Sequence, residues 1–235
     1  MSLPFPDPSL AVLFDCDGVL ADSEHLVDIL VAEELGARGW TLTPEEAGRI
    51  FLGKSLPDMV PIIEARLGPL PADWPATFAA RVAWTMERQV PPIPGAPEAV
   101  AAVRAAGLPV AVASNSGRAE LIVKLRRLGL TEAFAGRVFS FQDVPRPKPH
   151  PDIYLAAAAA CGVAPARCAV IEDSAVGARA GVAAGCRVLG FCRDTDPAVL
   201  RAAGASAVFR DMAELPALLG LEAVIPERPV QGAPA

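Results

Sequence analysis

Apolar residues occur in five short unbroken runs, and several of these runs end in a polar side chain. The first occupies residues 10–15 and reads LAVLFD; similar runs occupy residues 109–114, 168–173 and 186–191, and a shorter one lies at 207–209. A strand that is covered on both faces of a parallel sheet needs apolar residues at every position, not at every second one. The pattern therefore predicts five strands of a parallel sheet that is buried on both sides.

Helical segments are predicted between these strands, at residues 96–106, 118–128, 151–161 and 175–184. A glycine stands at or just after the end of each segment, where it supplies the left-handed cap of a helix; these are Gly107, Gly129, Gly162 and Gly185. The alternation of strands and helices predicts an α/β fold with a doubly wound, Rossmann-like parallel sheet.

Residues 23–90 interrupt this alternation with helical patterns alone, at 25–35, 44–50, 56–67 and 74–89. All three tryptophans (Trp40, Trp74 and Trp84) fall here and suit a small core of its own, and the proline-rich segment 90–95 makes a stiff connector. We therefore predict a catalytic core of residues 1–22 and 91–222 with an inserted all-helical cap of residues 23–90. Residues 223–235, rich in Pro, Gly and Ala, are expected to be disordered.

Composition narrows the class of protein. Of the 235 residues 52% are hydrophobic, the net charge is −6 and the pI is about 5.0, which argues against nucleic acid as a partner. Five cysteines without a CxxC pair favour a reduced, cytoplasmic protein, and two histidines disfavour zinc. No signal peptide or membrane-spanning run is visible, and we expect a monomer. Lysine is scarce, with only Lys54, Lys124 and Lys148, so each lysine draws attention as a compact ammonium that arginine cannot replace.

Polar residues with metal and phosphate chemistry follow the predicted strands. Because ligands of a parallel α/β sheet bind beyond the carboxyl ends of its strands, these residues should meet at one edge. Each has a simpler explanation when taken alone: turn acids, helix-capping residues or a solvated loop charge. Together these explanations are less convincing, because each would have to place its residue at the same edge of the sheet by coincidence. The candidates are Asp15 and Asp17, Ser114, Lys148, and the pair Glu172 and Asp173.

These motifs resemble those of the haloacid dehalogenase superfamily. Residues 15–24, DCDGVLADSE, resemble its first motif, Ser114 its second, Lys148 its third and residues 172–174 its fourth. The order matches, and the resemblance extends from Leu10 to about Leu219. The helical insert resembles the small cap of the branch that contains β-phosphoglucomutase and phosphoglycolate-type phosphatases.

The resemblance implies a role for each residue in a magnesium-dependent phosphatase. Asp15 would be the nucleophile that forms an aspartyl-phosphate, and Asp17 the general acid and base. Ser114, the amide of Asn115 and Lys148 would bind the phosphoryl group. The metal ligands would be the Asp15 side chain, the Asp17 backbone carbonyl and Asp173, with Glu172 nearby or acting through water. Lys54 and Ser55 are candidate cap contacts to a small phosphorylated substrate, such as a sugar phosphate or phosphoglycolate; His25 and Arg118 remain open.

Three other activities are weighed against this one. Asp17 argues against a dehalogenase, because a halide leaves without a proton. For a sugar phosphomutase of the β-phosphoglucomutase type, the resemblance leads us to expect a histidine where Val27 stands and a cap arginine where Leu56 stands. Both departures favour hydrolysis, although the mutase stays the main alternative. A non-catalytic phosphometabolite-binding protein is disfavoured, because the catalytic set is complete.

Overall fold

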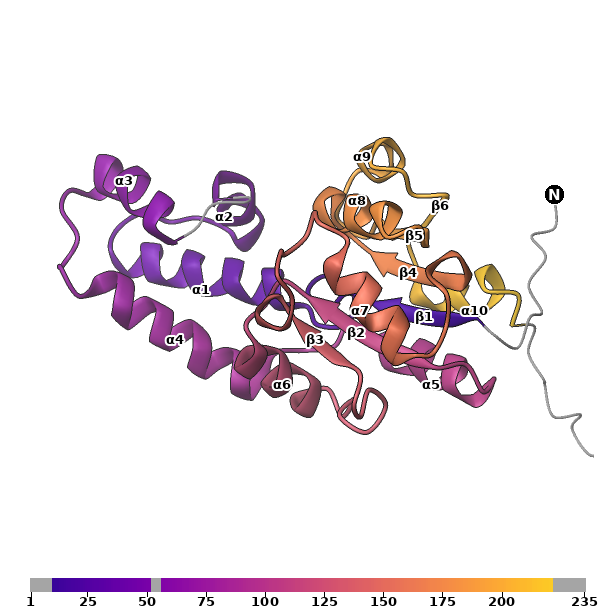
Figure 1. The fold of residues 1–235 in the computed structure, drawn as a ribbon. Coiled ribbons are helices and arrows are strands. Elements are labelled where there is room, and N and C mark those ends of the chain that lie inside the picture. The colour runs from indigo at the N-terminus through magenta and orange to yellow at the C-terminus, as the bar shows by residue number, and fades with distance from the viewer. Residues whose placement is uncertain (1–9, 52–55, 222–235) are drawn as a thin grey trace, which may run out of the picture.

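The computed structural model describes residues 10–51 and 56–221, which form a parallel sheet flanked by helices and a separate group of helices (Figure 1). The strands lie in the order β3-β2-β1-β4-β5-β6, and every neighbouring pair is parallel. The predicted doubly wound α/β fold is confirmed. The strands are β1 (Ala11–Phe14), β2 (Val110–Ser114), β3 (Val138–Ser140), β4 (Cys168–Glu172), β5 (Arg187–Phe191) and β6 (Ala207–Phe209).

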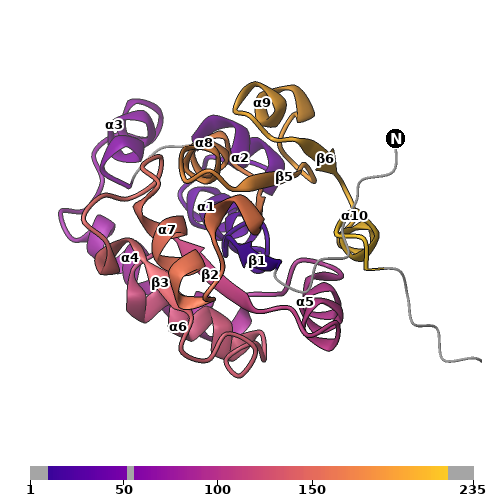
Figure 2. The same cartoon turned by 45° about the vertical axis from the view of Figure 1, so that its right-hand side comes forward.

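Side chains that alternate along each strand separate the core into two layers. Val12 and Phe14 of β1 face one layer, whereas Ala11 and Leu13 face the other. The first layer is covered by α5 (Ala96–Ala105), α6 (Arg118–Arg127) and α10 (Leu215–Leu218). The second is covered by α7 (Asp152–Ala160), α8 (Ala175–Ala183) and α9 (Pro197–Ala202), which Figure 2 shows on the opposite side of the sheet.

Edge strand β3 was not predicted, and neither were the short helices α9 and α10. β3 contains three residues and is only half-buried over most of its length, because it has a single neighbour, β2. In β3 only two apolar residues precede Ser140, which is too short an apolar run to differ from a loop. The apolar runs identified the fully buried strands β1, β2 and β4, together with β5 and the other edge strand β6, whose three residues are all apolar.

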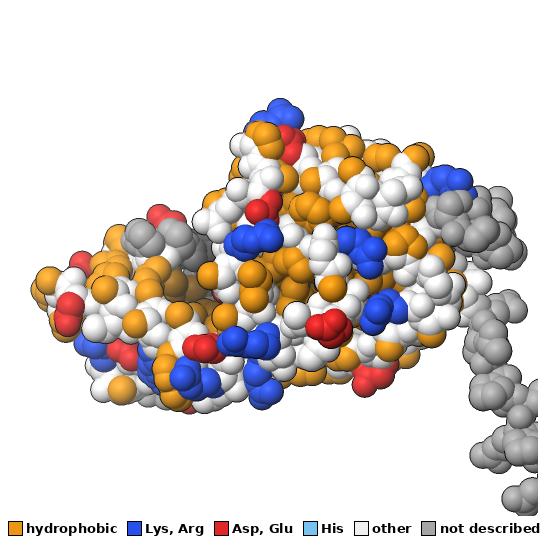
Figure 3. All heavy atoms as spheres, turned by 60° about the horizontal axis from the view of Figure 1, so that its bottom comes forward, with side chains coloured by type: hydrophobic (Ala, Val, Ile, Leu, Met, Phe, Trp, Pro, Cys, Tyr) orange, Lys and Arg blue, Asp and Glu red, His pale blue; other side chains and the backbone are white. Residues whose placement is uncertain are grey.

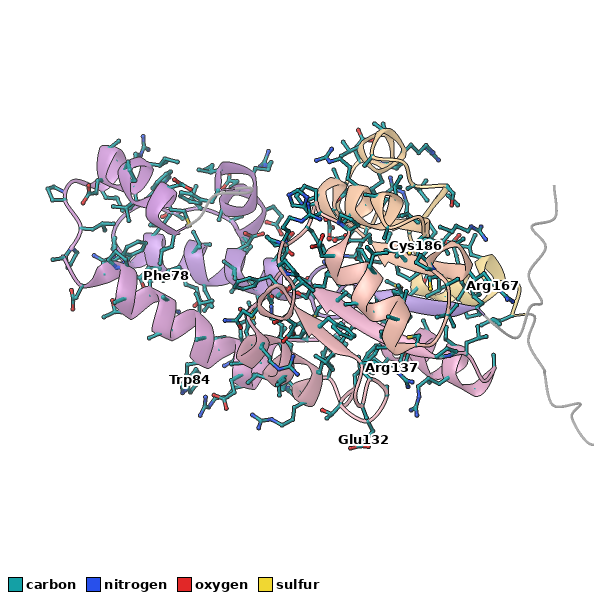
Figure 4. The ribbon with its side chains drawn as sticks, viewed as in Figure 1. Phe78, Trp84, Glu132, Arg137, Arg167 and Cys186 are labelled. Atoms are coloured by element: carbon teal, nitrogen blue, oxygen red, sulfur yellow. The ribbon has the colours of Figure 1, made fainter. Side chains whose placement is uncertain are left out.

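Four helices form the layer that we predicted as a cap: α1 (Ser23–Ala37), α2 (Pro44–Phe51), α3 (Leu56–Leu67) and α4 (Trp74–Gln89). They enclose a separate apolar cluster in which Trp74 stacks on Phe78 with ring centroids 5.2 Å apart. Trp84 is not part of this cluster: it is 53% exposed and lies beneath Arg88 on the outside of α4, whereas Phe78 is buried (Figure 4). Trp40 packs at the edge of the cluster.

The two segments that join the helical layer to the sheet run side by side. Ala21 pairs with Pro92 in an antiparallel bridge, the Asp22 amide donates to the Pro91 carbonyl, and the Ile93 amide donates to the Leu20 carbonyl. Backbone hydrogen bonds therefore hold the two connecting segments together. On the face drawn in Figure 3, Lys and Arg side chains are interspersed with Asp and Glu. In the part of the chain that the structure describes, no helix has the length and apolar character needed to cross a membrane.

Candidate active site

A cleft of about 830 Å³ opens between the helical layer and the carboxyl ends of the strands. Asp17, Lys124 and Asp173 line it from the sheet side, while Arg49 and Phe51 line it from α2. Its position agrees with the expectation that ligands bind beyond the carboxyl ends of parallel strands.

The turn after β1 directs its two aspartates to different surroundings. The Asp15 amide still follows the sheet, donating to the Ile171 carbonyl at 3.0 Å, and the chain then folds back so that the Gly18 amide donates to the Ala21 carbonyl. Gly18 has φ 72°, and a Cβ there would overlap the Asp173 carboxylate. Only glycine permits both this backbone conformation and the close approach of Asp173.

Lys148 lies between two buried carboxylates, those of Asp15 and Glu172. Its Nζ lies 2.6 Å from Asp15 Oδ1 and 2.6 Å from Glu172 Oε1. Burial would lower the pKa of Lys148, but the two carboxylates raise it instead, so the ammonium is charged. Its loop is held by the Asn115 side chain, which accepts from the Lys148 amide at 3.0 Å and donates to the Lys148 carbonyl at 3.2 Å. The Asn115 side chain therefore has an anchoring task that the sequence did not reveal.

Glu172 is fully buried, and both of its oxygens accept hydrogen bonds. Besides Lys148, Oε1 accepts from the Tyr154 hydroxyl at 2.7 Å, and Oε2 accepts from the Ser174 hydroxyl at 2.9 Å. A Cβ on Gly177 would overlap this carboxylate, so the N-terminus of α8 approaches Glu172 only because residue 177 is glycine. A buried carboxylate is stable in such surroundings because each acceptor is satisfied. Tyr154 is a further site residue that sequence reasoning missed.

Asp15, Glu172 and Asp173 form a group of carboxylates that suits a divalent cation. One oxygen from each lies within 4.8 Å of the others. Burial raises the pKa of Asp15 to about 7, although Lys148 acts to lower it. Burial, together with Glu172 and Asp15, raises the pKa of Asp173 well above its usual range. Crowded acids with raised pKa values favour a bound cation, and an all-oxygen set is typical of Mg²⁺.

Asp17 has a separate set of partners on the side that faces the cleft. Its Oδ1 accepts from the Lys124 ammonium and the Ser23 hydroxyl, and its Oδ2 accepts from the Ser116 hydroxyl at 2.7 Å and the Ser114 hydroxyl at 3.3 Å. Burial would raise the pKa of Asp17, but the Lys124 ammonium and these hydrogen bonds hold it below its usual value. The carboxylate of Asp17 is not one of the three that form the acidic group.

The structure thus brings together Asp15, Asp17, Ser114, Lys148, Glu172 and Asp173, as the strand-end argument predicted. Lys124 is the main residue that sequence reasoning missed; the scarcity of lysine was the one signal that pointed to it. Arg118 pairs with Asp143 at 2.6 Å, and its side chain is half exposed. His25 and Val27 line the cleft. Lys54 and Ser55 lie outside the described residues, and Leu56 begins α3.

Comparisons with known proteins identify the family of this chain. The haloacid dehalogenase-like hydrolase family matches residues 10–185. The 6-phosphogluconate phosphatase of Escherichia coli is 33% identical over 186 residues, which cover 78% of this chain and 83% of that protein. Hexitol phosphatase B of the same organism is 34% identical over 182 residues, covering 76% and 82%. A HAD family hydrolase from Deinococcus radiodurans, solved with bound phosphate and sodium, is 37% identical, has a TM-score of 0.82 and covers 92% of this chain and 98% of its own.

Proposed function

Because this chain belongs to the haloacid dehalogenase-like hydrolase family, we propose that it is a magnesium-dependent phosphatase acting through an aspartyl-phosphate on Asp15. Its substrate would be a small phosphomonoester, with a sugar phosphate favoured because curated relatives are a 6-phosphogluconate phosphatase and hexitol phosphatases. The observation that carries the proposal is the position of Lys148 Nζ, 2.6 Å from Asp15 and 2.6 Å from Glu172, beside Asp173.

In the first half of the proposed reaction, Asp15 Oδ attacks the phosphorus while the bond from phosphorus to the leaving oxygen breaks. Asp17, on the cleft side, takes up a proton when the anionic phosphate binds beside it and donates that proton to the leaving oxygen, which departs as an alcohol. Lys148 and Ser114 bind the transferred phosphoryl group. Lys148 holds the Asp15 carboxylate in place, which keeps the nucleophile aligned.

In the second half, water attacks the phosphorus of the aspartyl-phosphate, and Asp17 accepts the proton of that water. The bond between Asp15 and phosphorus breaks, inorganic phosphate is released and the carboxylate of Asp15 is restored. Mg²⁺ would be held by Asp15 and Asp173, with Glu172 and the Asp17 backbone carbonyl, and would offset the repulsion between the nucleophile and the phosphate.

Water is favoured over a second sugar hydroxyl as the acceptor of the phosphoryl group. Val27, which stands where the mutase resemblance leads us to expect a histidine, lines the cleft and offers no proton-transfer group. Incubation with β-glucose 1-phosphate separates the two activities: a phosphatase releases inorganic phosphate, whereas a mutase forms glucose 6-phosphate.

The proposal is tested by release of p-nitrophenol from p-nitrophenyl phosphate, with and without Mg²⁺. We expect hydrolysis by the native protein with Mg²⁺, its loss with a chelator and its recovery when Mg²⁺ is restored. Asp15→Asn, which preserves side-chain shape, should lose activity while its circular dichroism spectrum stays unchanged. Full activity of Asp15→Asn would overturn the proposal. A panel of hexitol phosphates, 6-phosphogluconate and phosphoglycolate then ranks the substrates.

A further inference from the structure

We propose that Lys124 is a positioning residue for Asp17: its buried ammonium fixes the Asp17 carboxylate on the leaving-group side of the site. This role rests on the proposed phosphatase reaction and adds to it a residue that belongs to none of the four sequence motifs. Lys124 lies on α6, 107 residues along the chain from Asp17. Its Nζ contacts the Asp17 carboxylate, whereas Lys148 contacts Asp15.

Lys124 is buried although it carries a charge and lines the cleft. The residue is 1% exposed, and its ammonium contacts Asp17 Oδ1, Glu120 Oε1 at 2.5 Å and Ser116 Oγ at 3.2 Å. An ammonium has three N–H donors, and each has an acceptor here. A buried charge is costly unless it is paired and hydrogen-bonded, so this geometry is fixed by its partners and does not fluctuate as a surface lysine does.

The contacts of Asp17 show why the lysine sets its position. Ser23 begins the cap helix α1, whereas Ser114 and Ser116 belong to the end of β2 and the loop after it. Among the described residues, Lys124 is the single cation that pairs with Asp17, and it connects the carboxylate to α6 of the core. Asp17 nevertheless lines the cleft, so the contact leaves the carboxylate within reach of a leaving group. Groups held in this way lose little freedom when the substrate arrives.

A positioning role and a purely structural ion pair predict different kinetics. Proton donation by Asp17 matters for an aliphatic alcohol, which is a poor leaving group, but little for p-nitrophenolate, which leaves without a proton. If Lys124 acts through Asp17, its loss impairs hydrolysis of aliphatic phosphates selectively. A structural ion pair would affect both substrates equally, because it would change the fraction of folded enzyme.

The test compares kcat/KM of native enzyme and Lys124→Met on p-nitrophenyl phosphate and on the best aliphatic phosphate of the substrate panel. We expect a loss on the order of 10²-fold on the aliphatic phosphate and less than about tenfold on p-nitrophenyl phosphate. The kcat/KM of the double variant Asp17→Asn with Lys124→Met should be within about twofold of that of Asp17→Asn alone. The effects of residues that act as a unit are not additive.

Arg126→Met is the matched control: it removes a cation from the same helix, where Arg126 is exposed and only 3.4 Å from Glu87. Arg126→Met should leave kcat/KM unchanged on both substrates. If Lys124→Met does not fold, Lys124→Gln, which keeps a donor without the charge, replaces it. Equal losses on both substrates, or additive losses in the double variant, would overturn the role of Lys124 and leave the phosphatase proposal standing. A native enzyme that hydrolyses neither substrate would overturn the phosphatase proposal itself.

Discussion

Asp15 and Asp17 are two residues apart, yet the fold places them in different environments. The Asp15 side chain is 10% exposed and contacts Lys148 beside two further carboxylates, whereas the Asp17 side chain is 27% exposed and contacts Lys124 and serine hydroxyls. The pKa of Asp15 is raised to about 7 by burial, while that of Asp17 is lowered because Lys124 and the hydroxyls outweigh burial.

In the proposed reaction, these two environments belong to two different tasks of the same residue type. A buried carboxylate among other acids needs a cation; Lys148 is one such cation beside Asp15, and in the proposed reaction Mg²⁺ would be the other. A carboxylate at the cleft, held by a lysine and hydroxyls, can exchange protons with substrate and water. The two buried lysines are divided in the same way: Lys148 pairs with Asp15, and Lys124 pairs with Asp17. Four sets of substitutions test this division, from the largest expected effect to the smallest.

Replacing each aspartate by asparagine should separate the two halves of the reaction. We expect Asp15→Asn to lower turnover of p-nitrophenyl phosphate by on the order of 10⁴-fold or more, without a burst of p-nitrophenol. Asp17→Asn should lower turnover by about 10²- to 10³-fold but retain a burst equal to the enzyme concentration, since only hydrolysis of the ester lacks its base. Rapid-mixing absorbance measures both. A burst from Asp15→Asn would contradict the assignment of the nucleophile.

Removing Lys148 should destabilise the fold more than removing Lys124. Lys148→Met leaves Asp15 and Glu172 buried without their cation, and we expect a cost of about 3–5 kcal/mol in the free energy of unfolding. Lys124→Met should cost less, because the Asp17 and Glu120 side chains it leaves behind are 27% and 50% exposed. Urea unfolding in metal-free buffer gives both values, with Arg126→Met as the surface control. Equal costs would show that the two lysines are not in different environments.

Tyr154→Phe should destabilise only the buried group around Glu172, Lys148 and Asp15. The substitution deletes the hydroxyl that donates to Glu172 at 2.7 Å and leaves the ring in place. A hydrogen bond to a buried charged group contributes about 1.5–3 kcal/mol, so we expect a loss of about 2 kcal/mol in the free energy of unfolding. The leaving-group preference that Lys124→Met alters should stay native. A variant as stable as the native protein would show that Glu172 does not depend on Tyr154.

Asp28, on α1, lines the cleft as Asp17 does. Its pKa is nevertheless raised, as that of Asp15 is. Burial and the nearby Glu24 raise its pKa to about 6 from 3.8, although His25 acts to lower it. The folded state therefore binds the proton more tightly, so ionised Asp28 destabilises the fold above pH 6, and this penalty fades as the pH falls from 6 towards 3.8.

Asp28→Asn should accordingly raise the free energy of unfolding at pH 7.5 by about 1 kcal/mol, a figure reduced for the solvent that screens this partly exposed group. At pH 4 the substitution should have little effect. Paired urea unfolding curves of the two proteins at both pH values supply the measurement. Stabilisation that is the same at both pH values would show that the charge of Asp28 is not the cause.

The sequence alone determined the central strands and the acids at their ends. β1, β2 and β4 are buried on both faces, so each is an unbroken apolar run, and each run stops where a polar group enters the site. Parallel strands bring these ends to one edge, and therefore Asp15, Ser114 and Asp173 could be placed together before the fold was known. The edge strand β3 was not predicted because its two half-buried apolar residues are followed at once by Ser140 and make no comparable run.

Only the tertiary structure decided which polar side chains support those acids. Lys124 and Tyr154 lie within the helices α6 and α7, where a lysine or a tyrosine is an ordinary residue for a helix face. Their partners are 107 and 18 residues away along the chain, and no local pattern encodes which helix residue faces which strand end. Strand-end chemistry is local because the strand and its last residue are contiguous, whereas the contact between Lys124 and Asp17 exists only once α6 packs beside the end of β1.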